Sequence, residues 1–337
     1  MGLVGSGKMG KEIFTALSEV FDSLVWITKT EEDAHNLINK FQKRISRQLK
    51  NGLITPADYD KKNRQTIITA DLDALKECHL ITESISEDLT KKRELFKKLH
   101  QIAQKECIIS SNTSSLLPSQ LCPHEDRRPY FLGIHYFYPT RLKNIVEIIK
   151  TEYLSPRTLD TVNSFLKYFK TRGIILNEKN AFILNRVLLN MQAKAFELVN
   201  EGVPAELIDR QVRENLLPIG VFELMEHVGL QVMESSIRNY MLNWNEYAHC
   251  QSMLGQIKKM NTNHINLLEG LTQGLNNTQN DQSEQTAKNI LKTLKDELSK
   301  SIQSILTNHY LTRDDLDYAL KEYFTTQESL LDKLEIQ

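Results

Sequence analysis

The pattern of apolar and polar positions divides the chain into two halves. Up to about residue 177, short β-branched apolar runs alternate with longer segments whose apolar residues recur at helical spacing, the rhythm of parallel βαβ units. The expected strands are 3–4, 23–28, 66–69, 80–82, 108–110, 131–135 and 146–150, and the expected helices include 8–21, 31–51 and 91–105. The pattern predicts an α/β fold with a doubly wound, mostly parallel sheet of the Rossmann type.

Strand signals end near 177–180, and helical patterns then run almost to the end of the chain. The second half is therefore expected to be all-helical. A polar, glycine-containing stretch at 270–285 indicates a loop or linker within it. Three parts are expected: a Rossmann domain at 1–179, a helical domain at 180–260, and a linker with a helical extension at 261–337.

A short pattern recurs within the helical half. The residues at 198–200 and 207–209 (LVN and LID) reappear at 306–308 and 315–317 (LTN and DLD), a constant offset of 108. This offset is typical of a weak internal duplication, which would make 288–334 a degenerate second helical module. Two unrelated helix-turn-helix segments with aspartates in their caps would give the same pattern.

Composition narrows the classes of partner. Lys and Arg (42) nearly balance Asp and Glu (43), so no net charge attracts nucleic acid or an anionic membrane. No apolar run approaches the roughly 18 residues of a membrane span, and no signal region follows Met1. The four cysteines form no CxxC pair, which argues against a zinc cluster or a disulfide framework. We expect a cytoplasmic protein without a metal.

A glycine-rich motif, Gly5-Ser6-Gly7-Lys8-Met9-Gly10, follows the first short strand and opens a helix. In this context the first glycine permits a tight turn, the second lets the backbone approach a pyrophosphate, and the third lets the helix pack on the strand. The helix N-terminus adds N–H groups and a positive dipole end. We therefore expect Gly5, Gly7, Lys8, Met9 and Gly10 to bind a dinucleotide cofactor.

The end of the second strand bears on which dinucleotide is bound. An NAD-specific site usually carries an acidic residue there, about 20 residues after the glycines, to bind the ribose 2′-hydroxyl. This chain has Thr28 and Lys29, which would not repel a 2′-phosphate and could bind one. The cofactor is thus NAD or NADP, with NADP slightly favoured. In the alternative interpretation Lys29 is solvated and Glu31 or Glu32 binds the ribose.

Four more segments carry a family resemblance: TESISED at 82–88, SNTSSL at 111–116, GIHYFYP at 133–139 and NIVEII at 144–149. With the glycine loop, their order resembles the 3-hydroxyacyl-CoA dehydrogenase family, and in particular its 3-hydroxybutyryl-CoA dehydrogenases. The resemblance runs to about residue 230 and includes AFILNR at 181–186 and PIGVFEL at 218–224. It implies an oxidoreductase of fatty acid metabolism that transfers a hydride between a nicotinamide cofactor and a 3-hydroxyacyl or 3-oxoacyl thioester.

Oxidation of a secondary alcohol needs a base for the hydroxyl proton, and a histidine suits both directions of such a reaction. His135, at a strand end, is the candidate, and Glu147 on the neighbouring strand could fix its tautomer. The resemblance makes these two the catalytic pair, assigns Ser114 to the reacting oxygen, and assigns Asn185 to substrate orientation. Each residue alone also fits a structural role, such as a turn or a helix cap.

Other charged residues have both a functional and an ordinary interpretation. Glu87 and Lys92 match family positions near the nicotinamide and its ribose, and they would also suit helix capping and solvation. A basic helix face suits either the phosphates of coenzyme A or an acidic acyl carrier protein, and it also fits a solvated surface. That face consists of Lys43, Arg44, Arg47 and Lys50. The carrier of the acyl group stays open.

Three departures from the family pattern concern the pocket and the C-terminal part. Tyr138 stands where asparagine usually precedes the proline, Val221 replaces a proline, and the family's closing K-[ST]-G-x-G-F-Y turn is missing after Gly229. The resemblance implies a homodimer built from the helical domain, which also binds substrate. A second module could instead imitate that dimer within one chain, so homodimer and monomer are both open.

Two other classes fit part of the pattern. A β-hydroxyacid dehydrogenase would share the glycine loop but would use a catalytic lysine, and the His135 segment disfavours it. A non-catalytic NAD(P)-binding or structural relative would explain the unusual C-terminal part, whereas the intact set of Ser114, His135, Glu147 and Asn185 opposes it. The sequence therefore favours an active dehydrogenase.

Overall fold

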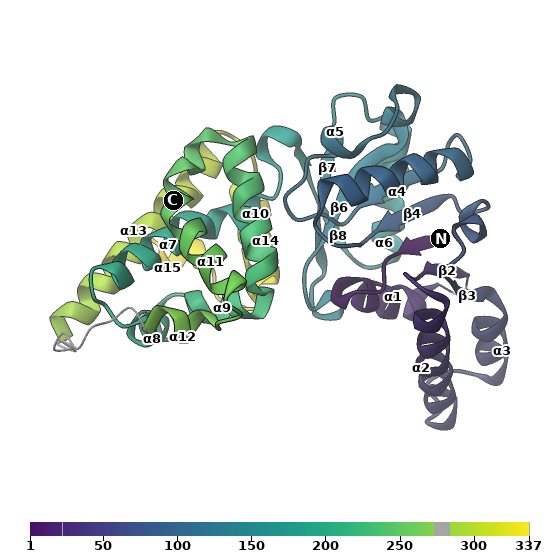
Figure 1. Ribbon diagram of the computed structural model, residues 1–337, viewed down its shortest axis with the longest axis horizontal. Coiled ribbons are helices and arrows are strands. Elements are labelled where there is room, and N and C mark those ends of the chain that lie inside the picture. Colours follow the sequence, from purple (N-terminus) through teal and green to yellow (C-terminus); the bar gives the residue numbers. More distant parts are fainter. Residues whose placement is uncertain (22, 273–283, 337) are drawn as a thin grey trace. The chain divides into compact units, whose positions relative to one another are not determined.

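The computed structural model describes residues 1–21, 23–272 and 284–336 (Figure 1). The chain forms two compact units that divide between Ala181 and Phe182, two residues after the expected boundary. Most of the linker predicted at 270–285 lies outside the described residues. Each unit is considered by itself below.

The first unit is built on one sheet, whose described strands follow the order β3-β2-β1-β4-β5-β6-β7-β8. Neighbouring strands run parallel except for the antiparallel pair β6 and β7. This topology confirms the predicted Rossmann-type sheet. The strands are β1 Gly2–Val4, β2 Leu24–Ile27, β3 Thr66–Thr69, β4 Leu80–Glu83, β5 Ile108–Ser111, β6 Phe131–Tyr136, β7 Ile145–Lys150 and β8 Arg172–Asn177.

The pattern of apolar residues did not predict β8. It is an edge strand that pairs with β7 alone, and along it Ile174 and Leu176 are buried while Ile175 is 42% exposed. Its apolar run has only three residues, Ile174 to Leu176, and its polar ends complete the strand by pairing with β7. The first strand, by contrast, is short as expected, and β1 still pairs with β2 on one side and β4 on the other.

Successive strand residues point to opposite faces of the sheet, and their apolar side chains pack against helices on both faces. Leu3 and Ile108 belong to the apolar cluster that includes residues of α1, α2 and α6, whereas Val4 and Ile109 belong to the cluster that includes α4. The three helices predicted by range are present with small shifts at their ends, as α1 Lys8–Val20, α2 Glu31–Lys50 and α4 Leu89–Ile102. The unit also contains α3 Pro56–Gln65, α5 Pro118–Leu121 and α6 Pro156–Tyr168.

The described residues of the second unit form helices joined by turns, with no strand among them, which confirms the all-helical second half. Its helices are α7 Ile183–Asn200, α8 Ala205–Asn215, α9 Val221–Val228, α10 Leu230–Asn243, α11 Gln251–Thr262, α12 Leu267–Thr272, α13 Glu284–Thr307, α14 Arg313–Phe324 and α15 Leu330–Lys333. The long helices α7 and α13 pack against each other. The Asn190 amide of α7 donates to the Ser301 hydroxyl of α13 at 3.0 Å.

The helices α7, α8 and α9 correspond in order to α13, α14 and α15. Helix α8 begins at Ala205 and α14 at Arg313, which gives the offset of 108 seen in the sequence (313 − 205). Asp209 of α8 accepts hydrogen bonds from two backbone N–H groups in the first turn of α9. The equivalent Asp317 of α14 accepts from the hydroxyl of Ser329, the N-cap of α15. In both triplets, an aspartate on the second helix thus holds the start of the third.

In the part of the chain that the structure describes, no helix is long and apolar enough to cross a membrane. The same residues contain no cluster of three His, Cys, Asp or Glu side chains arranged to hold a metal ion.

Candidate active site

The glycine loop joins β1 to α1 and has the backbone geometry that a dinucleotide diphosphate requires. Gly5 has a φ of +115°, and a Cβ there would lie 2.3 Å from the carbonyl oxygen of Ser84. A Cβ on Gly10 would lie 2.1 Å from the carbonyl oxygen of Gly5, so helix and turn meet without side chains. A Cβ on Gly7 would meet nothing within 4 Å. The backbone at Gly7 is therefore open to a phosphate, and α1 starts at the next residue.

Lys8 and Tyr138, one a predicted cofactor residue and the other a departure from the family pattern, lie together. The Lys8 ammonium sits 4.0 Å from the centroid of the Tyr138 ring, a cation–π distance. Arg141, three residues further along, forms an exposed ion pair with Glu19 of α1 at 3.9 Å. The loop after β6 is thus tied to both ends of α1.

At the end of β2, the sequence suggested that Thr28 and Lys29 could together bind a 2′-phosphate, but the structure exposes only Lys29. Thr28 is buried, and its hydroxyl donates to the carbonyl of Thr30 at 2.8 Å. Lys29 is exposed. The Glu31 carboxylate accepts from the Thr69 hydroxyl and the Ala70 N–H at the end of β3. Lys29 is therefore the cation that this turn presents, while Thr28 and Glu31 are engaged with the backbone.

His135 and Glu147 form a direct cross-strand pair. In the antiparallel register of β6 and β7 the two residues are opposite each other, which places their side chains on the same face of the sheet. Nδ1 of His135 lies 2.7 Å from Oε2 of Glu147. Glu147 is fully buried and His135 is 6% exposed, so the contact is shielded from water. A carboxylate at Nδ1 favours the tautomer with the proton on that nitrogen, and this leaves Nε2 as the basic atom.

A second cluster of polar residues joins Ser114 to Glu87. The Glu87 carboxylate accepts from the backbone N–H of Ser114 at 3.0 Å, from the Ser115 hydroxyl at 2.7 Å and from the Thr113 hydroxyl at 2.5 Å. These bonds fix the turn after β5 that carries Ser114. Burial would raise the pKa of Glu87, but Lys92 and these hydrogen bonds outweigh it and lower that pKa below its usual value.

Lys92 is fully buried between two carboxylates. Its ammonium lies 2.6 Å from Glu83 and 3.5 Å from Glu87. Burial alone would lower the pKa of Lys92, and the two carboxylates outweigh that effect and raise it. With 1% of its side chain exposed, Lys92 presents almost no surface to solvent, and its ammonium is engaged by Glu83 and Glu87. Its geometry is that of a residue that holds other site residues in position.

Sequence reasoning missed two polar residues that organise these strand ends. Glu83, the last residue of β4, accepts from Lys92, from the Ser111 hydroxyl and from the N–H of Ile85. Asn112 accepts from the N–H of Tyr136 in β6 and donates to the Ser84 hydroxyl. Their position offered a signal: both lie at the carboxyl ends of parallel strands, the edge where α/β sheets bind ligands.

Asn185 belongs to the second unit, in the first turn of α7. Its amide donates to the Tyr240 hydroxyl at 3.4 Å and accepts from the Tyr323 hydroxyl at 3.2 Å. The preceding Phe182 has a left-handed backbone (φ 56°) and is completely buried, a strained conformation of a kind that clusters at functional sites. Val221 is the first residue of α9, where proline and valine both fit, because that N–H has no intrahelical partner.

The expected basic face of α2 needs one correction. Arg44 is only partly exposed, because its guanidinium packs over the rings of Phe14 and Phe41 and donates to the Ser18 hydroxyl. Burial lowers the pKa of Arg44. The other three members, Lys43, Arg47 and Lys50, are exposed.

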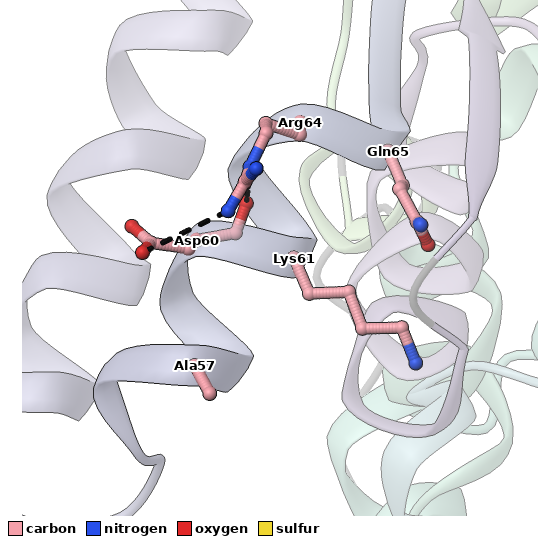
Figure 2. A pocket seen from close by; sticks show the side chains of 5 residues that line it. All are labelled: Ala57, Asp60, Lys61, Arg64 and Gln65. Atoms are coloured by element: carbon pink, nitrogen blue, oxygen red, sulfur yellow. Dashed lines mark hydrogen bonds and ion pairs between the residues drawn. The ribbon is translucent and has the colours of Figure 1, made fainter.

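A surface pocket lies beside α3, away from this chemistry (Figure 2). Its lining residues are Ala57, Asp60, Lys61, Arg64 and Gln65. Gln65 directly precedes β3, so the pocket lies toward the amino end of that strand, whereas the polar groups above follow the carboxyl ends of β4, β5 and β6. Arg64 and Asp60 form an exposed ion pair within it.

A glycine loop at the head of a doubly wound sheet, together with a buried histidine–carboxylate pair on strands of the same sheet, is typical of the class of nicotinamide-dependent dehydrogenases. Comparison with known proteins agrees. Residues 1–179 match the model for the 3-hydroxyacyl-CoA dehydrogenase NAD-binding domain, and residues 182–270 match that for the C-terminal domain of the same family. The chain belongs to the 3-hydroxyacyl-CoA dehydrogenase family, as the sequence motifs indicated, and it is an oxidoreductase.

Individual relatives support this assignment. The mitochondrial hydroxyacyl-coenzyme A dehydrogenase of Sus scrofa is 31% identical over 240 residues, 68% of this chain and 75% of the relative. The crystal structure of (S)-3-hydroxybutyryl-CoA dehydrogenase PaaH1 from Ralstonia eutropha is 25% identical with a TM-score of 0.67, covering 77% of this chain and 93% of that one. The 3-hydroxybutyryl-CoA dehydrogenase of Escherichia coli K12 shares the fold at 14% identity, with a TM-score of 0.75 over 98% of this chain and 90% of that one.

Proposed function

We propose that this protein interconverts 3-hydroxyacyl-CoA and 3-oxoacyl-CoA, with His135 as the general base in oxidation and the general acid in reduction. The observation that carries the proposal is the buried contact of 2.7 Å between His135 and Glu147, on β6 and β7 of the sheet that also carries the glycine loop. Membership of the 3-hydroxyacyl-CoA dehydrogenase family supplies the class of substrate.

In oxidation, Nε2 of His135 takes the proton of the substrate hydroxyl as the hydrogen on the same carbon leaves as hydride. When bound, the nicotinamide accepts that hydride. Glu147 holds the imidazole ring through Nδ1 and stabilises the imidazolium that forms, because its negative charge is buried beside it. The Ser114 hydroxyl, which donates a long hydrogen bond of 3.4 Å to Glu87 in the structure, turns to donate to the reacting oxygen, and Asn185 orients the thioester. Reduction follows the same steps in reverse.

We propose that the protein uses NADP, which carries a 2′-phosphate, as well as NAD. Lys29 is exposed at the end of β2, and the Glu31 carboxylate is turned toward Thr69 and Ala70. An ammonium there would attract a 2′-phosphate. Three acidic residues in the first turn of α2 oppose this attraction, so we expect NADPH and NADH to be used with similar efficiency, within roughly tenfold (1.4 kcal/mol).

The acyl carrier that we propose is coenzyme A. An acyl carrier protein is a second candidate, because Lys43, Arg47 and Lys50 remain exposed on α2 and would suit its acidic surface. The two are separated by comparing acetoacetyl-CoA with the acetoacetyl carrier-protein thioester. Neutralising the three cations would raise KM for the carrier-protein substrate more than for the CoA substrate if the protein surface is recognised.

We also propose a monomer in the cytoplasm. The α13 to α15 triplet packs on α7 of the first triplet through α13, which is the kind of contact that a second subunit would otherwise provide. All four cysteines are free thiols, as a reducing compartment maintains them. Light scattering would give a mass near 39.0 kDa for a monomer, and twice that mass would exclude this proposal.

The decisive experiment compares acetoacetyl-CoA reduction by the wild type, His135→Gln and the control His35→Gln. His35 is exposed on α2, so its replacement should leave turnover unchanged. Loss of a general acid lowers the rate by roughly 10²- to 10⁴-fold, and NADH binding should persist because it depends on other residues. Full activity in His135→Gln would refute the assigned chemistry, and loss of NADH binding would refute the site map.

A further inference from the structure

The amide of Asn185 is bracketed by two phenol groups that come from distant parts of the second unit. Tyr240 lies on α10 and Tyr323 on α14, 55 and 138 residues further along the chain. Tyr240 accepts from the amide nitrogen, and Tyr323 donates to the amide oxygen. Both ends of the Asn185 side chain are thereby fixed.

The two phenols are themselves held rigidly. Tyr240 is 3% exposed and packs against the rings of Phe182 and Trp244. The ring of Tyr323 meets that of the buried Phe324 edge to face at 4.9 Å. Helix α14 is anchored in turn by its Thr312 N-cap and by contacts with α15. Aromatic residues packed in this way lose little further entropy when they hold a neighbouring group.

The bracketed amide keeps capacity for a ligand. An asparagine side chain offers two N–H donors and two acceptor lone pairs, and the tyrosines engage one of each. Asn185 is partly exposed, so a second N–H can reach a bound molecule. A thioester or 3-oxo carbonyl is an acceptor of the kind that such an N–H would orient.

We propose that Tyr323 is a positioning residue for the substrate, acting through Asn185. The inference rests on the proposed function, in which Asn185 orients the thioester. It assigns a role to the C-terminal triplet, because Tyr323 lies beyond residues 182–270, where the family model matches. Helices α13 to α15 then support the substrate site in addition to packing on α7.

The test measures acetoacetyl-CoA reduction by Tyr323→Phe and by the matched control Tyr310→Phe, which removes a hydroxyl from the turn between α13 and α14. Removing one neutral hydrogen bond should lower kcat/KM for acetoacetyl-CoA by about 3- to 10-fold in Tyr323→Phe. KM for NADH should match that of Tyr310→Phe, and the thermal midpoint of Tyr323→Phe should fall below that of the control by no more than about 2–6 °C, the loss expected for one hydrogen bond. Asn185→Ala and the double variant Asn185→Ala/Tyr323→Phe complete a cycle.

The cycle separates positioning from general structural support. If Tyr323 acts through Asn185, its replacement has no further effect in the Asn185→Ala background. An equal loss in both backgrounds, or the same loss in Tyr310→Phe, would overturn the inference. If the wild type is active and Tyr323→Phe has the same kcat/KM as the wild type, the role of Tyr323 is refuted while the proposed function stands. Failure of the wild type to turn over, or full activity of His135→Gln, would remove the proposed function and this inference with it.

Discussion

Replacing Lys92 with methionine should destabilise the first unit strongly, because it leaves two buried carboxylates without their cation. Glu83 is fully buried and lies 2.6 Å from the Lys92 ammonium, and Glu87 lies 3.5 Å from it with 12% of its side chain exposed. Removing one partner of a buried ion pair costs about 3–5 kcal/mol. At about 2–4 °C per kcal/mol for a unit of this size, the thermal midpoint should fall by roughly 6–20 °C.

The neighbouring Lys91 provides a matched control. Its side chain is 65% exposed and forms an ion pair with Asp88 at 3.5 Å, a solvent-exposed contact worth about 0–1 kcal/mol. Both variants can be made in a Trp244→Phe background, which leaves Trp26 of β2 as the single tryptophan and makes its fluorescence report on the first unit. Urea unfolding then gives the free energy of unfolding of that unit.

The pH dependence of Lys92→Met tests the cause. In the wild type the pKa of Glu87 is lowered, so its contribution is present above the unfolded value of about 4.3 and is lost as pH falls through the folded pKa. The pKa of Lys92 is raised, so its contribution is present below about 10.4 and is lost as pH rises through the folded pKa. Without Lys92, the pKa of Glu87 should rise above its wild-type value, because the ammonium that opposes the effect of burial is gone, and protonation then relieves the unpaired charge.

The destabilisation of Lys92→Met should therefore be larger at pH 7.5 than at pH 5. A loss no greater than that of Lys91→Met, or a difference that stays constant over this pH range, would refute the argument that Lys92 compensates buried charge.

Four further substitutions have defined outcomes. Gly10→Ala places a methyl group 2.1 Å from a backbone oxygen and should weaken NADH binding at least about tenfold in a fluorescence titration. In Gly7→Ala the added methyl group meets no atom within 4 Å, so the free energy of unfolding should stay unchanged. Glu147→Gln should lower kcat on the order of 10²-fold, with KM for NADH unchanged, because it removes the charge beside His135 without changing shape. Asp209→Ala should destabilise the second unit by about 1–2 kcal/mol in calorimetry, since two N–H groups of α9 lose their acceptor.

The local part of the site could be predicted from sequence because it depends on short-range patterns. The glycine loop is a contiguous motif, and its turn follows from the absence of side chains at Gly5 and Gly10. The strand carrying His135 follows from an apolar run with turn signals at its end. These features need no knowledge of what packs against them.

The support of the site depends on packing between distant segments, and periodicity contains no information about it. The burial of Lys92 follows from the position of α4 against the end of β4, and a lysine in a polar helix otherwise resembles a surface residue. Arg44 was assigned to a surface for the same reason. Tyr323 reaches Asn185 across 138 residues of chain through the packing of α14 on α7. In each case a long polar or amphipathic side chain has two possible environments, and tertiary packing decides between them.

The antiparallel direction of β7 explains how two residues 12 positions apart can form the buried pair. In a parallel arrangement a crossover of a dozen or more residues separates the strands, so a residue facing His135 would come much later in the chain. In the hairpin of β6 and β7, the amino end of β7 lies at the same edge of the sheet as the carboxyl end of β6, and Glu147 falls opposite His135. The connecting segment is the one whose Tyr138 contacts Lys8 of the glycine loop and whose Arg141 pairs with Glu19. One strand reversal thus both pairs His135 with Glu147 and ties the β6–β7 hairpin to α1, the helix that follows the glycine loop.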